Sequence, residues 1–240
     1  MTRSKLPQFP QDGLKFLKSL RRNNRREWFL EHKETYETCV RGPMIQLVEA
    51  LAEELALFAP EMVANPKVSL YRIYRDTRFS KDKTPYKTHT AASFPLRGVE
   101  RHQGAGFYFH ISPTEFLIGG GLYSPLPEDL AAVRQHIAAK SGELDAVLRA
   151  RGFRRLFKEL SGEQLQRVPR GFPADHPAAG HLRRKQFLAM RVMPSELATT
   201  SKFGGVILES FRALHPLIRF LNEPILRAHL AKQRRAQLMH

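Results

Sequence analysis

Basic and aromatic side chains are interleaved in one short stretch of the sequence, RIYRDTRFSKDKTPYK at positions 72–87. Arginine stands at every third position of its first half, as Arg72, Arg75 and Arg78. A guanidinium group presents a rigid fork of donors that fits the oxygens of a phosphate or carboxylate group. The stretch therefore predicts an anion-binding site, in which a phosphate-sized group lies between a strand and the charged turn that follows it.

Other side chains of the stretch could contact the anion or take part in catalysis. Lys83 and Lys87 add positive charges, and Tyr86 adds a hydroxyl group. In a catalytic site, Asp76 would be the general base and Lys83 or Tyr86 the proton donor. The ligand would be bound by the three arginines and Lys87, together with two residues of a later glycine run, Gly120 and Gly121.

The two aspartates of the stretch support a structural alternative. On a strand, Arg72, Asp76 and Arg78 would share one face and Arg75 would lie on the other. One arginine could then pair with Asp76, and Asp82 offers a second carboxylate in the turn. The stretch could thus be an internal brace of ion pairs that locks the turn. The sequence leaves the choice between an anion site and a brace open.

Glycines 119–121 stand at the end of a predicted strand. Glycine lets a backbone approach a ligand closely, and it equally allows a bulge or a tight turn. Beside the arginine-rich strand the run would form the opposite wall of a pocket. It matches neither common nucleotide-binding loop, and the sequence identifies no cofactor. The histidines show no metal-ligand spacing, although His89, His102 and His110 could converge in a sheet.

The run from Arg72 to Tyr86 resembles the signature of DUF2461, a family of bacterial proteins of about this length. The motif is long, with fixed Arg, Asp, Phe, Lys and Tyr positions. The resemblance covers about residues 9–223 and implies a family, but no activity. Further features similar to that family are Asn23-Asn24, Trp28-Phe29, Gly106-Phe107-Tyr108, Gly119-Gly120-Gly121, Pro169 and Gly171-Phe172.

The chain is strongly basic, with a net charge of +16 from 39 Lys and Arg against 23 Asp and Glu. Such a charge is typical of nucleic-acid-binding proteins when it gathers on one face, and it also arises from solvated side chains. The single cysteine, Cys39, excludes an internal disulfide. Neither a signal peptide nor an apolar run of the ~20 residues that a membrane helix needs is evident. We therefore expect a cytoplasmic protein without a membrane partner.

Helical patterns occupy both ends of the sequence. Asp12 is expected to cap a first helix, and Asn24 with Glu27 resembles a capping box for the next. A broad apolar stripe at residues 45–58 indicates a longer helix. Later helices are expected from Pro127, from Ser141 and over residues 203–232, where Pro216 and Pro224 should break the last one.

Strand patterns occupy the middle of the sequence. The motif should begin as a strand at Lys67, turn at 81–85 and return as a second strand at 88–96. A hairpin is expected at 107–118, and a further strand at 186–193. Consecutive strands with short connections favour an antiparallel sheet.

We therefore expect one α+β domain over residues 1–240, with a mainly antiparallel sheet packed against N-terminal and C-terminal helices. Residues 227–240 would be a basic tail, helical or frayed. The preferred function is binding of a phosphorylated small molecule on the 72–87 motif, with or without catalysis. The alternatives are a nucleic-acid-associated protein and a structural or partner-binding protein with the motif as a brace. Whether the chain is an enzyme is left open.

Overall fold

The computed structural model describes residues 6–238, with residues 233–238 as helical backbone. Its N-terminal part is a series of helices, α1 (Gln11–Arg22), α2 (Arg26–Glu31), α3 (Lys33–Tyr36), a π-helical turn η1 (Glu37–Arg41), α4 (Gly42–Phe58) and α5 (Pro66–Ser69). The predicted stripe on α4 is buried at Leu47, Val48, Leu51 and Leu55. The expected cap at Asp12 is wrong, because Pro10 holds the cap position and Asp12 pairs with Lys15.

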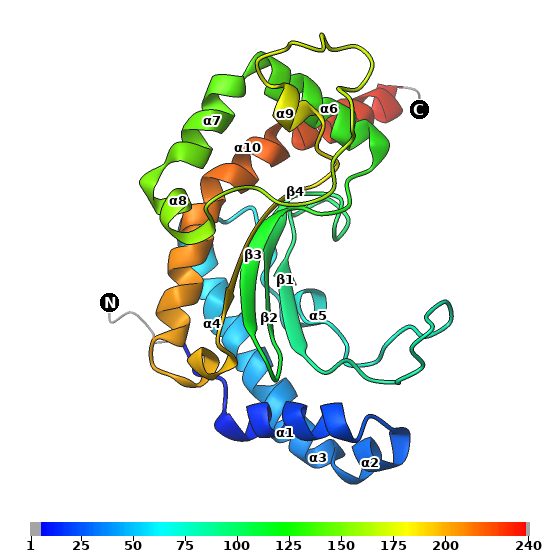
Figure 1. Ribbon diagram of the computed structural model, residues 1–240, viewed down its shortest axis with the longest axis vertical. Coiled ribbons are helices and arrows are strands. Elements are labelled where there is room, and N and C mark those ends of the chain that lie inside the picture. The colour runs from blue at the N-terminus through cyan, green and yellow to red at the C-terminus, as the bar shows by residue number, and fades with distance from the viewer. Residues whose placement is uncertain (1–5, 239–240) are drawn as a thin grey trace. The chain divides into compact units, whose positions relative to one another are not determined.

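Four strands form one antiparallel sheet in the order β1-β2-β3-β4 (Figure 1). Each strand is the neighbour of the next one in the sequence, although the connection from β3 to β4, residues 123–186, is long and contains helices. With helices before and after this sheet in the chain, the predicted α+β class is confirmed. The strands are β1 (Thr90–Phe94), β2 (Gly106–Ile111), β3 (Phe116–Leu122) and β4 (Phe187–Met193).

The side chains of β2 divide the sheet into an apolar and a polar face. Phe107, Phe109 and Ile111 are buried, whereas the residues between them, Tyr108 and His110, are only half-buried. The long helix α10 (Phe203–Leu238) covers the apolar face, since Phe107 stacks on Phe211 with 4.4 Å between ring centroids. Phe109 and Phe116 both contact Phe203 edge-on. This arrangement leaves Tyr108 and His110 on the opposite face.

The chain forms two compact units. One contains the residues up to Phe94, 108–118 and 191–209, and the other contains 95–107, 119–190 and the residues from Ser210 onwards. Strands β2, β3 and β4 contribute residues to both. The single domain expected over residues 1–240 stays a prediction.

The second unit is built around the later part of α10. Four helices belong to it, and the side chain of Asn222 exchanges two hydrogen bonds with the backbone of Ala105, at 2.8 and 2.9 Å. The helices are α6 (Pro127–Ala139), α7 (Ser141–Arg149), α8 (Arg151–Phe157) and α9 (Ala179–Leu182).

The predicted breaks in the last helix are wrong. Helix α10 continues through Pro216 and Pro224 to Leu238. A proline inside a helix removes one backbone hydrogen bond, but here the residues directly after the two prolines, Leu217 and Ile225, are fully buried. Their packing holds the helix together across both positions. The expected basic tail is helical up to residue 238, and its last two residues lie outside the described part.

The largest difference from expectation concerns the motif. The strand predicted from Lys67 is wrong, because residues 66–69 form helix α5 and residues 70–89 form an irregular, doubled-back segment that we call the arm. Figure 1 shows the arm as a long loop between α5 and β1. The expected pairing across the turn does occur, but as two isolated antiparallel bridges, one between Leu70 and Ala92 and one between Tyr74 and Tyr86.

Local side-chain hydrogen bonds explain why the arm is not a regular hairpin. Asp76 accepts from the backbone N–H of Arg78 at 3.2 Å, and Asp82 accepts from that of Thr84 at 2.9 Å. Such short-range bonds offer the backbone an alternative to a strand ladder. The same residues that suggested a site therefore shape an irregular loop.

Candidate anion-binding site

The base of the arm is fixed to the first helices. Tyr86 is buried and stacks on Phe29 of α2, with 4.1 Å between ring centroids. The side chain of Asn24 donates to the carbonyl oxygen of Tyr86 at 2.9 Å and accepts from its N–H at 3.1 Å. The expected capping box of Asn24 and Glu27 is wrong, since Arg25 caps α2 without a side-chain bond. Asn24 instead binds a backbone 62 residues away.

Arg75 braces the arm from inside. Its Nη1 donates to Asp82 and to Thr84, and its Nη2 lies 3.5 Å from the hydroxyl of Ser80. The Arg75 guanidinium, followed by the hydrogen bonds from Thr84, lowers the pKa of Asp82 to about 2. Asp82 is therefore a carboxylate throughout the physiological range. This ion pair matches the brace alternative, and it also fixes the position of Arg75.

A second pair occupies the exposed side of the arm. The Arg78 side chain donates two hydrogen bonds to the carboxylate of Asp76, from Nε at 3.0 Å and from Nη2 at 2.8 Å. This fork lowers the pKa of Asp76, so the carboxylate is a poorer proton acceptor than an unpaired one. Lys83 donates to the backbone carbonyl of Thr77 at 2.9 Å. The expected catalytic roles of Asp76 and Lys83 stay predictions, and both groups have partners within the arm.

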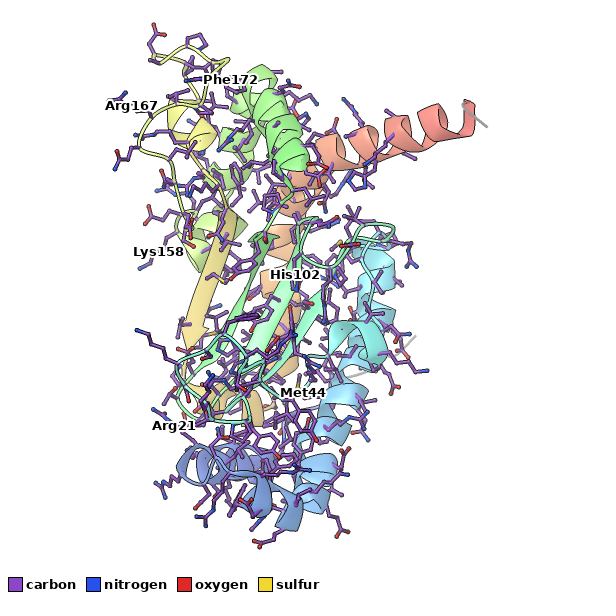
Figure 2. All side chains as sticks on the ribbon, turned by 90° about the vertical axis from the view of Figure 1, so that its right-hand side faces the viewer. Arg21, Met44, His102, Lys158, Arg167 and Phe172 are labelled. Atoms are coloured by element: carbon purple, nitrogen blue, oxygen red, sulfur yellow. The ribbon has the colours of Figure 1, made fainter. Side chains whose placement is uncertain are left out.

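A pocket of about 640 Å³ lies between the arm and the end of α1. Three cationic side chains line it, from α1 and from the two branches of the arm: Arg21, Arg75 and Lys87. Figure 2 labels Arg21, near the C-terminal end of α1. Besides hydroxyl and amide groups, the acceptors in the lining are Asp76, Asp82 and His89.

The structure brings together four of the predicted site residues, Arg75, Asp76, Tyr86 and Lys87, in the lining of this pocket. Burial raises the pKa of Tyr86, so its hydroxyl stays protonated at neutral pH. The remaining motif residues, Arg72, Arg78 and Lys83, are exposed and do not line it. Sequence reasoning missed Arg21, whose only signal was its place among the basic residues of positions 15–26. It also left His89 without a role in this site.

The glycine run has a packing function. A Cβ atom at Gly120 would lie 2.7 Å from the carbonyl oxygen of Gly106 on β2. At Gly121, where φ is +128°, it would lie 1.9 Å from the carbonyl oxygen of Phe187 on β4. Neighbouring strands thus approach too closely for any side chain. Neither glycine lines the pocket, and their expected part in ligand binding stays a prediction.

A polar cluster on the second face of the sheet adjoins the pocket wall. His110 bonds to the hydroxyl of Tyr108 through Nδ1 at 3.1 Å and to Glu115 through Nε2 at 3.0 Å. The ring of His89 lies 5.1 Å from that of His110. The expected convergence thus holds for these two histidines, whereas His102 contacts Tyr123.

His89 is held in its neutral form. Burial, followed by the nearby His110 and Lys87, lowers the pKa of His89 to about 4. At neutral pH one of its ring nitrogens is therefore a hydrogen-bond acceptor. Among the described residues, no group of three or more His, Cys, Asp or Glu side chains is placed to hold a metal ion.

None of the helices in the described part of the chain is long and apolar enough to cross a membrane. A comparison with curated proteins gives no match, and neither does a comparison with solved structures. The family model of the conserved hypothetical protein DUF2461 matches residues 12–220 of the 240-residue chain. This match confirms the resemblance that the 72–86 motif indicated. The chain therefore belongs to the DUF2461 family of conserved hypothetical proteins.

Proposed function

We propose that the pocket beside the arm binds the phosphate group of a phosphorylated small molecule. The main support for this proposal is that one pocket is lined by three cationic side chains, Arg21, Arg75 and Lys87. They come from three separate parts of the first unit. Cations placed around a partly enclosed space attract an anion more strongly than the same cations spread over a surface.

The carboxylates of the pocket do not cancel this attraction. Asp82 offsets the charge of Arg75, and Asp76 is neutralised by Arg78, which lies outside the lining, so the charges of Arg21 and Lys87 remain. Arg21 makes no ion pair among the residues that the structure describes. Arg75 has more N–H donors than its bonds to Asp82, Thr84 and Ser80 require. Donors and net positive charge are therefore available to a ligand.

The size of the pocket favours a small ligand. A volume of about 640 Å³ falls within the roughly 300–1,000 Å³ that is usual for sites of small molecules and cofactors. Hydroxyl groups of Thr84 and Thr88 add polar contacts next to the cations. The chemistry of the lining thus fits a phosphate group that carries a modest organic part.

Inorganic phosphate is expected to raise the melting temperature of the protein more than chloride at the same ionic strength. A ligand that binds only the folded state stabilises it by about 1.4 kcal/mol for each tenfold excess over its dissociation constant. Thermal melts at increasing phosphate should show a saturable shift in the wild type. The shift should be reduced in Arg21→Ala.

The neighbouring variant Arg22→Ala is the matched control. Arg22 is an exposed arginine of α1 that does not line the pocket, and its removal changes the net charge equally. Its phosphate shift should equal that of the wild type. Phosphate also stabilises proteins generally through exclusion from the surface. Identical shifts in all three proteins would show only this general effect and would refute the pocket.

One observation favours a second candidate function, the binding of single-stranded nucleic acid. Phe79 is 94% exposed near the far end of the arm, and the Arg78 guanidinium lies 5.8 Å from its ring centroid. Lys81, Lys83 and Arg72 are exposed along the same arm. Aromatic rings that stack on bases, next to cations that contact the backbone, are the usual means of binding single strands.

This second function predicts that Phe79→Ala weakens binding of a short single-stranded DNA. Stacking of one base on an aromatic ring contributes roughly 1–3 kcal/mol, so affinity should fall about 5- to 150-fold. Fluorescence anisotropy with a labelled oligonucleotide at two salt concentrations measures it. Leu57→Ala, which removes an exposed apolar side chain of α4, is the control. Equal affinity of both variants would leave only non-specific charge attraction.

A further inference from the structure

The lining of the pocket contains acceptors as well as donors. Asp76, Asp82 and His89 face the same space as the three cations. Sulfate is fully deprotonated at neutral pH and presents only acceptor oxygens. Inorganic phosphate keeps a proton near neutral pH, and a phosphate monoester gains one with a pKa of about 6. A protonated phosphate can therefore satisfy donors and acceptors together.

Among the imidazole and carboxylate acceptors of the lining, His89 is the one that holds no hydrogen bond within the described part of the chain. Each of the two carboxylates already accepts three hydrogen bonds, Asp76 from Arg78 and Asp82 from Arg75 and Thr84. The His89 ring makes no hydrogen bond to any other residue in the described ranges. The imidazole of His89 lies beside cationic side chains, and no described side chain donates a hydrogen bond to it. It gains a hydrogen bond when a hydroxyl group of the ligand donates to it.

The surroundings of His89 favour the neutral ring. His110 contacts it from β2, and Lys87 lies on its own segment, so both oppose a positive charge. Glu115, directly before β3, favours the charged ring, but it is hydrogen-bonded to His110. Tyr108, bonded to the other nitrogen of His110, completes the cluster on this side.

We propose that His89 makes the pocket selective for a phosphate group that carries a proton, against sulfate and other fully deprotonated oxyanions. The P–OH group donates to a ring nitrogen of His89, while Arg21, Arg75 and Lys87 bind the remaining oxygens. This inference rests on the proposed function of the pocket. It narrows the ligand class to phosphate monoesters or inorganic phosphate.

The proposal gives a defined pH dependence for a monoester. As the pH falls from 8 to 6, the fraction of the ligand that carries a proton rises, because its second ionisation lies at about 6. His89, with a pKa of about 4, remains neutral and accepting over this range. Binding of methyl phosphate should therefore tighten as the pH falls. Binding of sulfate should gain much less, since neither sulfate nor His89 takes up a proton there.

Isothermal titration of inorganic phosphate and of sulfate at pH 6.5 and matched ionic strength tests the proposal. The wild type should bind phosphate about tenfold more tightly than sulfate, because sulfate leaves the half-buried acceptor of His89 unsatisfied. In His89→Phe, which keeps a ring but removes the acceptor, the preference should fall to roughly twofold while sulfate binding is retained. His32→Phe is the control, since His32 stacks on Trp28 away from the pocket.

The outcomes separate this proposal from the function on which it rests. An unchanged preference in His89→Phe, or none in the wild type, overturns the selectivity but leaves anion binding intact. Failure of the wild type to bind either anion overturns both. If His89→Phe does not fold, the imidazole C2–H signal of His89 in the wild type decides. Its NMR shift should respond to phosphate and not to sulfate, and equal responses refute the proposal.

Discussion

Gly121→Ala is expected to destabilise the fold by roughly 3–5 kcal/mol, from left-handed backbone strain together with a backbone clash. The φ of Gly121 is +128°, which side-chain-bearing residues rarely adopt, and a Cβ atom would lie 1.9 Å from the carbonyl oxygen of Phe187. That oxygen belongs to strand β4 and cannot turn away as a flexible side chain would. Urea denaturation of the purified variant, followed by circular dichroism, measures the loss.

The matched control is Gly142→Ala in helix α7, where an added Cβ meets nothing within 4 Å. Alanine is favoured over glycine inside a helix by up to ~1 kcal/mol, so this variant should be as stable as the wild type or slightly more stable. Equal stability of the two variants would show that β3 and β4 do not require a glycine at 121. A ligand-related reason for the glycine run would then regain support.

Local patterns in the sequence predicted the regular elements well. The alternation of Phe107, Phe109 and Ile111 with polar residues is a property of the strand alone, and strand β2 follows it. The stripe of α4 repeats at helical spacing and is buried accordingly. Such periodicities predict helices and strands because each element buries one face, and the residues of that face must be apolar.

The arm could not be predicted in the same way, because its contacts do not follow any regular period. Arg75 pairs with Asp82, seven positions along, across a loop that is neither helix nor strand. The motif contains both charges, but their partnership depends on the loop conformation. That conformation in turn depends on which side-chain oxygens take the backbone N–H groups of Arg78 and Thr84.

The pocket was predicted only in part, because its lining also depends on contacts that follow no regular period. Four motif residues indicated it, but the third cation, Arg21, comes from α1 and carries no local sign of its role. One residue, Arg75, also has features of both alternatives, the anion site and the brace. Arg75 holds the arm through Asp82 and lines the pocket at the same time. The ion pair with Asp82 fixes the Arg75 guanidinium in place, so less side-chain entropy is lost when a ligand binds to it.

Asn24 is the other residue whose role only the fold reveals, and Asn24→Ala is expected to destabilise the first unit by about 2–4 kcal/mol. The substitution leaves both the N–H and the carbonyl oxygen of Tyr86 without their side-chain partner. These groups lie at the base of the arm beside the buried Tyr86 ring, where water can replace the two lost hydrogen bonds only in part. The arm should open more often, so limited proteolysis within residues 76–84 should accelerate along with the loss in melting temperature.

The adjacent Asn23→Ala provides a control of identical chemistry. Asn23 donates to the carbonyl oxygen of Ser19 at 3.0 Å at the exposed end of α1, where water can take its place. Its replacement should cost well under ~1 kcal/mol and leave cleavage of the arm unchanged. Phosphate binding should also weaken in Asn24→Ala and not in Asn23→Ala, because Arg75 and Lys87 flank the segment that Asn24 fixes. Equal stability and equal cleavage of the two variants would mean that stacking of Tyr86 on Phe29 holds the arm without Asn24.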